Sequence, residues 1–149
     1  TIDVDWGKKE IEEQKMVTSF VVSQLSSIVE KVQCSDTYTH KAGTLLHLRT
    51  DITGSLKNQN SSIKDILEVL HPTPAVCGLP KSKAKSFILA NEGYTRKYYT
   101  GFLGELNIAG DKKNETNIFV NLRCMELIRD KVKLYVGGGI TKDSDPEKE

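Results

Sequence analysis

The sequence lacks any excess of charge of one sign, because its 21 basic and 20 acidic residues leave a formal charge of +1. This balance gives no electrostatic support for a nucleic acid or an anionic membrane as partner. No apolar run is long enough to span a bilayer, and no signal-peptide pattern opens the chain. Cysteine is scarce, and Cys34, Cys77 and Cys124 show no paired metal-ligand spacing. We therefore expect reduced thiols in a cytoplasmic protein.

The length of 149 residues suits one domain with its own core and argues against two. The chain has no initiator Met, since it starts at Thr1 just before a strongly helical pattern. It stops at Glu149, where no sequence feature signals a natural terminus. We expect residues 1–149 to form a single partial domain that was taken from a longer protein.

The first half of the chain is predicted to hold a long helix and a strand. Apolar residues recur at three- and four-residue steps from Lys8 to about Val32, with no Gly or Pro between them, which predicts one amphipathic helix. Residues alternate in polarity over Thr44–Leu56, where Thr53 and Gly54 also form a turn signal. A strand followed by a turn is therefore predicted there.

Two shorter helices are predicted in the middle of the chain. Ser61 or Ser62 is placed to cap a helix that runs through Leu70, just before a His-Pro pair. A second helix is predicted over Lys81–Asn91, with Gly93 closing it. At the start of this second helix, Lys81 is interpreted as a surface residue.

The last part of the chain reads as an antiparallel meander. Tyr98–Ile108 leads to a turn over 109–112, and Asn117–Leu127 then alternates in polarity. A turn at 129–131 leads into a further alternating segment, Val132–Val136. Helices combined with consecutive antiparallel strands predict an α+β fold.

Proline is scarce, yet three of the four prolines fall within His71-Pro-Thr-Pro-Ala-Val-Cys-Gly-Leu-Pro-Lys81. Each proline fixes φ, removes an amide donor and biases the preceding residue toward extended geometry. A backbone this rigid can offer main-chain groups of the residues after Pro74 to a ligand. It can equally form a structural corner between two elements, and the pattern alone leaves both interpretations open.

The same eleven residues resemble the HPTPAxxGxP signature of isochorismate synthases, which belong to the chorismate-utilising enzyme family. The resemblance runs nearly end to end and implies the C-terminal half of the family fold, an antiparallel sheet with a long helix and shorter helices packed on it. It also implies chorismate and isochorismate as ligands and Mg²⁺ as cofactor. Anthranilate and aminodeoxychorismate synthases usually carry a different motif here, so the resemblance favours the branch that adds water over the branch that adds ammonia.

Two acidic residues of the first helix form a candidate metal site. Glu10 and Glu13 are neighbours on the helix surface, and carboxylates that face the interior need a compensating cation such as Mg²⁺. A solvated first turn, favoured by the helix dipole, is the alternative. The segment 9–18 resembles the family's KDxxEHxxxV helix, with Gln14 in place of its His. The resemblance implies that Glu13 binds Mg²⁺ directly, with Glu10 and Glu149 in the outer shell and a second direct ligand beyond residue 149.

Candidate substrate-binding residues lie on several segments. His47 stands among leucines, where a lone histidine is usually a core residue, and the resemblance implies that it lines the active site with no assigned role. The planar fork of Arg123 suits a carboxylate, although a surface ion pair is the alternative. A glycine triplet that includes Gly137 and Gly138 permits close backbone approach, or forms a flexible turn. The resemblance implies that Arg123 and these glycines bind substrate carboxylates, and it adds Ala75, Val76 and Tyr99 as substrate contacts.

The resemblance implies an isochorismate synthase, in which water adds at C2 of chorismate and the C4 hydroxyl leaves. Its lysine base and its glutamic acid belong to the N-terminal half of the family fold, so this chain alone is expected to be inactive. The alternatives are an anthranilate, aminodeoxychorismate or salicylate synthase, and a non-catalytic binding module derived from the fold. Menaquinone biosynthesis is favoured over siderophore biosynthesis as the commoner housekeeping route. An isolated half-fold exposes apolar surface, which predicts self-association.

Overall fold

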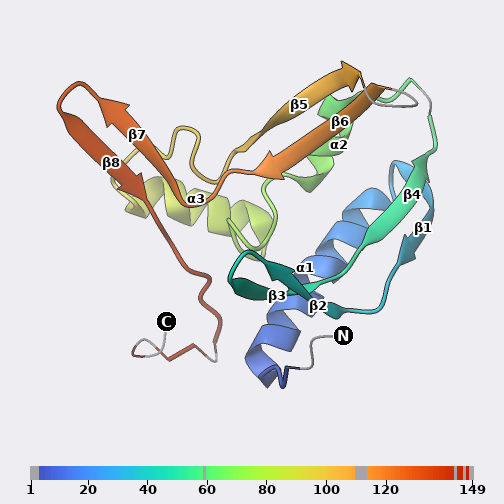
Figure 1. Cartoon of the computed structure of the whole chain (residues 1–149), viewed down its shortest axis with the longest axis horizontal. Helices are drawn as coiled ribbons and strands as arrows, with labels where there is room; N and C mark the ends of the chain where they lie inside the picture. The colour runs from blue at the N-terminus through green and yellow to red at the C-terminus, as the bar shows by residue number, and fades with distance from the viewer. Residues whose placement is uncertain (1–3, 59, 110–113, 143, 146, 148–149) are drawn as a thin grey trace.

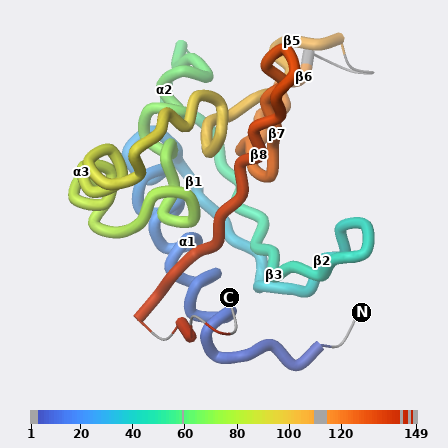
Figure 2. The backbone as a smooth tube through the Cα atoms, turned by 90° about the vertical axis from the view of Figure 1, so that its left-hand side faces the viewer, coloured from blue at the N-terminus to red at the C-terminus, as the bar shows by residue number. Residues whose placement is uncertain are grey.

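The computed structural model describes residues 4–58, 60–109, 114–142, 144–145 and 147. These residues form an α+β fold in which every strand pair is antiparallel. Its elements are α1 (Lys8–Leu25), β1 (Val29–Cys34), β2 (Tyr38–Ala42), β3 (Leu45–Arg49), β4 (Ile52–Leu56), α2 (Ile63–Leu70), α3 (Lys81–Asn91), β5 (Phe102–Ala109), β6 (Asn114–Val120), β7 (Cys124–Ile128) and β8 (Lys131–Tyr135). Figures 1 and 2 show the helices on one side and the β5–β6 and β7–β8 hairpins on the other. Within the described ranges, no helix combines the length and apolarity that a membrane span requires.

The first helix is shorter than predicted, because it ends at Leu25 and the chain then enters strand β1. The hydroxyls of Ser26 and Ser27 each donate to a backbone carbonyl of the last turn at 2.7 Å, and such bonds offer the backbone an alternative to continued helix. Beyond them, Val29 and Val32 are β-branched, as strands favour, and Val29 pairs with Leu56 of β4. The prediction of helix up to Val32 was therefore wrong, since the apolar period continues across the junction.

Strands β1 to β4 form one long bent hairpin, in which β2 pairs with β3 and β1 pairs with β4. The predicted single strand over Thr44–Leu56 is divided at Thr50 and Asp51, and β2 was not predicted. Thr53 and Gly54 do not form a turn, because both lie inside β4. Gly54 instead lies opposite a register irregularity in β1, where a side chain would collide with Val29.

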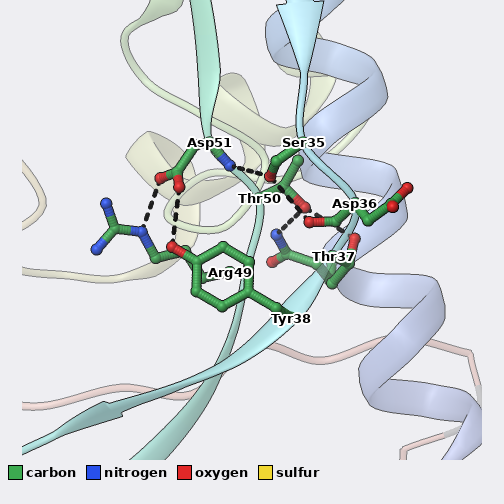
Figure 3. Close-up of polar contacts among 8 residues, drawn as sticks. Ser35, Asp36, Thr37, Tyr38, Arg49, Thr50 and Asp51 are labelled. Atoms are coloured by element: carbon green, nitrogen blue, oxygen red, sulfur yellow. Dashed lines mark hydrogen bonds and ion pairs between the residues drawn. The ribbon is translucent and has the colours of Figure 1, made fainter. Parts of the chain in front are cut away.

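A polar cluster holds the bend of this hairpin (Figure 3). The carboxylate of Asp51 accepts hydrogen bonds from Tyr38 Oη and Arg49 Nε, both at 2.8 Å. The hydroxyls of Thr37 and Thr50 lie 2.8 Å apart, and Gln14 Nε2 of α1 donates to Thr50 Oγ1 at 3.3 Å. The bonds to Tyr38 and Arg49 lower the pKa of Asp51. The cluster therefore fixes the bend and connects it to α1.

The two shorter helices were predicted correctly, and Ser62 is the cap of α2. Ser62 Oγ accepts from the amide of Asp65 at 3.4 Å, while the Asp65 carboxylate accepts from the amide of Ser62 at 2.6 Å. This reciprocal pair is a capping box, which satisfies donors that a helix start leaves unpaired. The Ser62 amide and the Ser62 hydroxyl, which donates to Asp65 Oδ2 at 3.1 Å, lower the pKa of Asp65.

We expect Ser62→Ala to lower the free energy of unfolding by about 1 kcal/mol, because the Asp65 amide loses its side-chain acceptor. Urea unfolding of the full-length protein measures the change. Ser61→Ala is the matched control, since Ser61 contributes only its backbone amide to the turn, at 3.0 Å from Asn58 O. Equal losses in the two variants would contradict this assignment of the cap.

The predicted meander is two separate hairpins, β5–β6 and β7–β8, rather than one continuous sheet. The strand predicted over Asn117–Leu127 is interrupted after Val120, and Arg123 has a φ of 46°. Asn121 explains the interruption, because its backbone and side chain bond to the turn at 98–101. Thr100 N donates to Asn121 O at 2.8 Å, and Asn121 Nδ2 donates to Tyr98 O at 3.0 Å.

Little of the chain is buried. The accessible surface is 11756 Å², whereas the size scaling of compact monomers gives about 7600 Å² for a chain of 16.6 kDa. Tyr99 and Tyr135 are the buried hydrophobic residues of the described part. One face of the β7–β8 hairpin is wholly apolar and more than half exposed at each of its residues, which are Met125, Leu127, Val132 and Leu134.

Candidate functional site

The buried centre of the candidate site is a pair of stacked tyrosines. The rings of Tyr99 and Tyr135 lie 5.5 Å apart at 27°, and Tyr94 packs at 6.2 Å from Tyr135. Lys133 Nζ lies 5.0 Å from the centroid of the Tyr135 ring, where the ring face attracts a cation. A hollow of about 380 Å³ adjoins both buried rings, and Asn121 also lines it. Tyr99 therefore lines one side of this hollow.

The Pro-Thr-Pro segment forms a closed loop between α2 and α3. The His71–Pro72 and Leu79–Pro80 peptide bonds are cis. Lys81 Nζ donates to His71 O at 2.7 Å and so joins the two ends of the loop. Lys81 is half-buried and lies 5.9 Å from the ring of Phe20, so its interpretation as a simple surface residue was wrong.

The interior of this loop is also held by hydrogen bonds. The amides of Val76 and Cys77 both donate to Thr73 O at 3.1 Å. Val76 O accepts from Arg96 Nη1 at 3.0 Å, and Val76 is half-buried while Ala75 is exposed. The prediction that Ala75 and Val76 bind substrate through main-chain groups stays a prediction. The backbone amide of Val76 is already bonded within the loop.

Arg96 is a residue of the site that the sequence did not reveal. Its Nε donates to Glu92 Oε2 at 2.6 Å, and its Nη2 donates to Glu92 Oε1. The guanidinium lies 5.6 Å from the Tyr99 ring centroid. The bonds from Arg96 lower the pKa of Glu92, and the bond to Glu92 raises the pKa of Arg96. A Glu and an Arg four residues apart give a local signal for the ion pair, but none for the bond to Val76.

Gly137 lies directly against Tyr99. A side chain at position 137 would collide with the Tyr99 hydroxyl, whereas a side chain at Gly138 would meet nothing within 4 Å. Only a residue without Cβ allows this close approach. The glycine segment is exposed and follows β8, so its main chain is accessible beside the tyrosine pair. The roles of Gly137 and Gly138 in binding a carboxylate stay predictions.

Arg123 and His47 have exposed side chains. Arg123 lies in the connection between β6 and β7, not inside a strand as predicted. His47 lies in β3 directly opposite His40, which packs edge-on against Tyr38 at 6.4 Å. His47 is therefore not a core histidine in this structure. In the described residues Arg96 links Val76 and Tyr99 by a hydrogen bond and a ring contact, and Gly137 lies close to the Tyr99 hydroxyl. These contacts do not extend to His47 or Arg123.

Glu13 carries an oxygen that fits a metal ligand. Its Oε1 is shielded from solvent and has no hydrogen-bond partner, while Lys9 Nζ lies 3.9 Å away. A shielded carboxylate oxygen without a hydrogen-bond donor is costly, and the Lys9 ammonium offsets part of that cost. Mg²⁺, which prefers oxygen ligands, would also suit this oxygen. Glu10 is exposed and lies back against Gly7. Within the described residues no cluster of three acidic, histidine or cysteine side chains forms, and Glu149 lies outside them.

His71 and Glu126 complete the charges around the loop and the tyrosines. Burial, with Lys81 and Lys85 nearby, lowers the pKa of His71, whose ring packs edge-on against Phe102 at 5.3 Å. His71 therefore packs against Phe102 where the loop begins. The carboxylate of Glu126 accepts from Tyr135 Oη at 3.2 Å and from Lys97 Nζ, and the bond from Lys97 lowers its pKa.

Residues 6–149 match the family model described as chorismate binding enzyme, so the chain belongs to this family. Isochorismate synthase DhbC of Bacillus subtilis is 32% identical over 142 residues, which cover 95% of this chain and 35% of that protein. Isochorismate synthase MenF of Escherichia coli is 39% identical over 103 residues, which cover 69% of this chain and 22% of that protein. The solved structure of MenF, the menaquinone-specific isochorismate synthase from Escherichia coli, superimposes with a TM-score of 0.81 and 29% identity, over 95% of this chain and 32% of that one. The chain therefore spans about a third or less of the length of these relatives.

Proposed function

We propose that the protein containing this chain is a cytoplasmic isochorismate synthase that converts chorismate to isochorismate with Mg²⁺. The observation that carries the proposal is the His71–Lys81 loop, whose sequence is similar to that of isochorismate synthases. In the structure this loop is held beside Tyr99 by Arg96. The similarity to DhbC and MenF supports the same function. The fold of MenF, the menaquinone-specific enzyme, supports the same assignment.

The residues of this chain bind and orient the substrate in this proposal. Arg123 and the amides of Gly137 and Gly138 hold carboxylates of chorismate, and Tyr99 lies against the ring. Glu13 binds Mg²⁺, which anchors a substrate carboxylate when bound. The base that activates water and the acid that protonates the leaving hydroxyl come from another part of the protein. The chain alone is therefore expected to have little or no activity.

Water, rather than ammonia, is the proposed nucleophile, because the HPTPA motif is typical of the water-adding branch. An anthranilate, aminodeoxychorismate or salicylate synthase remains the alternative within the family. Menaquinone biosynthesis is the proposed pathway, and the similarity to MenF supports it. The similarity to DhbC, whose relative in Bacillus anthracis is described as specific for 2,3-dihydroxybenzoate, supports the siderophore alternative.

The proposal is tested by incubating the full-length protein with chorismate and Mg²⁺, with and without ammonia. We expect isochorismate at the same rate in both reactions. An amino-containing product that forms only with ammonia would move the protein to the other branch of the family. No product under either condition would favour a non-catalytic module.

We also propose that the isolated chain self-associates through its exposed apolar surface. The excess of accessible area over that of a compact monomer is about 4000 Å² per chain by size scaling, more than the about 1000–2500 Å² that each partner of an obligate interface buries. Light scattering of the 149-residue chain over a range of concentrations should show oligomers that grow with concentration. Replacing Leu127 and Leu134 by serine should reduce them. A monomer at every concentration would contradict the expectation.

A further inference from the structure

We propose that Arg96, held in place by Glu92, is a positioning residue that sets where the Ala75–Val76 main chain lies relative to the Tyr99 ring. The proposal rests on the function proposed above, in which both segments contact chorismate. Arg96 acts through these segments and does not touch the reacting atoms. Its role concerns the affinity for substrate rather than the attack of water.

The geometry of the guanidinium is the first argument. Glu92 accepts from Nε and Nη2, and this two-point contact fixes the plane of the group. The Nη1 atom is then directed at Val76 O, at 3.0 Å, and at Thr100 Oγ1, at 3.1 Å. A lysine ammonium, as a single point charge, cannot hold Glu92 and reach Val76 with the same orientation.

The peptide that Arg96 contacts is fixed from two sides. The peptide group between Val76 and Cys77 makes both contacts. Its N–H, from Cys77, donates to Thr73 O at 3.1 Å, and its C=O, from Val76, accepts from Arg96. Thr73 belongs to the same loop, so its bond maintains the loop itself. The bond from Arg96 comes from the segment after α3, so it relates the loop to the segment that carries Tyr99.

The other side of Arg96 faces the tyrosine pair. Its guanidinium lies 5.6 Å from the centroid of Tyr99, which stacks on Tyr135 and lies against Gly137. The side chains of Arg96 and Glu92 are 23% and 25% exposed, so solvent screens this ion pair less than one at the surface. Arg96 therefore contacts two predicted substrate-contacting segments directly, at Val76 and Tyr99, and Gly137 lies beside the second of them.

The test compares Arg96→Lys with the charge-swapped double variant Glu92→Arg/Arg96→Glu in the full-length protein. The swap restores an ion pair between positions 92 and 96, but a glutamate cannot donate to Val76 O. We expect both variants to lower kcat/KM for chorismate by about tenfold to a hundredfold, because a displaced contact segment costs that much. The loss should lie mainly in KM. Thr100→Val is the control, since it removes only the minor contact of Nη1.

A merely structural role gives a different pattern. In that case the swap would recover both the stability and the activity that Arg96→Lys loses, and KM would stay unchanged as the folded fraction falls. Hydrogen exchange of the Val76 and Cys77 amides, measured without substrate, gives a readout independent of activity. We expect faster exchange in both variants than in Thr100→Val.

The two proposals can fail separately. Unchanged exchange at these amides, or an unchanged KM in Arg96→Lys, would overturn the role of Arg96. A wild-type protein that does not convert chorismate would overturn the proposed function, and the exchange rates alone would then decide whether Arg96 anchors the loop.

Discussion

Glu13→Gln is expected to abolish most of the Mg²⁺-dependent activity of the full-length protein. Glutamine keeps the size of the side chain but removes the charge that a divalent cation requires. The shielded Oε1 of Glu13 lacks a hydrogen-bond donor, and Lys9 Nζ pairs with it only at 3.9 Å, so a divalent cation bound there would add a closer compensating charge. We expect a loss of at least about a hundredfold, because even residues that only support metal ligands can cost that much. A titration of activity with Mg²⁺ measures it.

The control for this prediction lies one position away. Glu12 is on the same helix, its side chain is 50% exposed, and it pairs with Lys8 at 3.8 Å. Glu12→Gln should therefore keep the Mg²⁺ dependence of the wild type. Thermal melting gives a second readout, since Mg²⁺ should raise the Tm of the wild type and of Glu12→Gln but not of Glu13→Gln. An unchanged Mg²⁺ titration in Glu13→Gln would remove Glu13 from the metal site.

Gly137→Ala is the second substitution for which we expect a large effect. The added methyl would collide with the Tyr99 hydroxyl, so either the buried ring or the main chain at residue 137 must shift. Overpacking of this kind costs about 1–3 kcal/mol of stability. We also expect a marked loss of affinity for chorismate, because Tyr99 and the amide of residue 137 both move. Urea unfolding and a chorismate titration of the full-length protein measure the two effects.

Two further variants separate the collision from other effects of alanine. Gly138→Ala should keep the stability of the wild type, since a side chain there has nothing within 4 Å. Tyr99→Phe removes the oxygen that the new methyl meets, so Gly137→Ala/Tyr99→Phe should regain most of the lost stability. If Gly138→Ala is equally destabilised, or if the double variant regains nothing, the close approach of Gly137 and Tyr99 is not the cause.

Those elements that carry their own end signals could be predicted from the sequence. The cap at Ser62 and the prolines on either side of the His71–Lys81 loop set the limits of α2 and α3 as expected. The end of α1 could not be predicted, because Ile28 and Val32 continue its apolar period. Their place in and beside β1 depends on pairing with β4, more than twenty residues later.

In the candidate site, too, some residues lie in local sequence motifs and others depend on contacts with distant segments. The metal and substrate candidates, which stay predictions, were proposed from local motifs, as for Glu13, Tyr99 and Gly137. The role of Arg96 could not be proposed in this way, since its partner at Val76 is a backbone carbonyl twenty residues earlier, and any residue type carries that group. The interruption of the predicted strand at Asn121 likewise depends on hydrogen bonds with the turn at 98–101. Long-range bonds to main-chain atoms leave no pattern in the sequence.

The most direct test of the central claim is the reaction of the full-length protein with chorismate and Mg²⁺ in water enriched in heavy oxygen. Addition of water at C2 with loss of the C4 hydroxyl requires that each isochorismate gains a single oxygen atom from the solvent. Mass spectrometry of the product should therefore show one heavy oxygen, whether or not ammonia is present. Isochorismate without the label, or a product that contains nitrogen in place of the new oxygen, would contradict the proposed reaction.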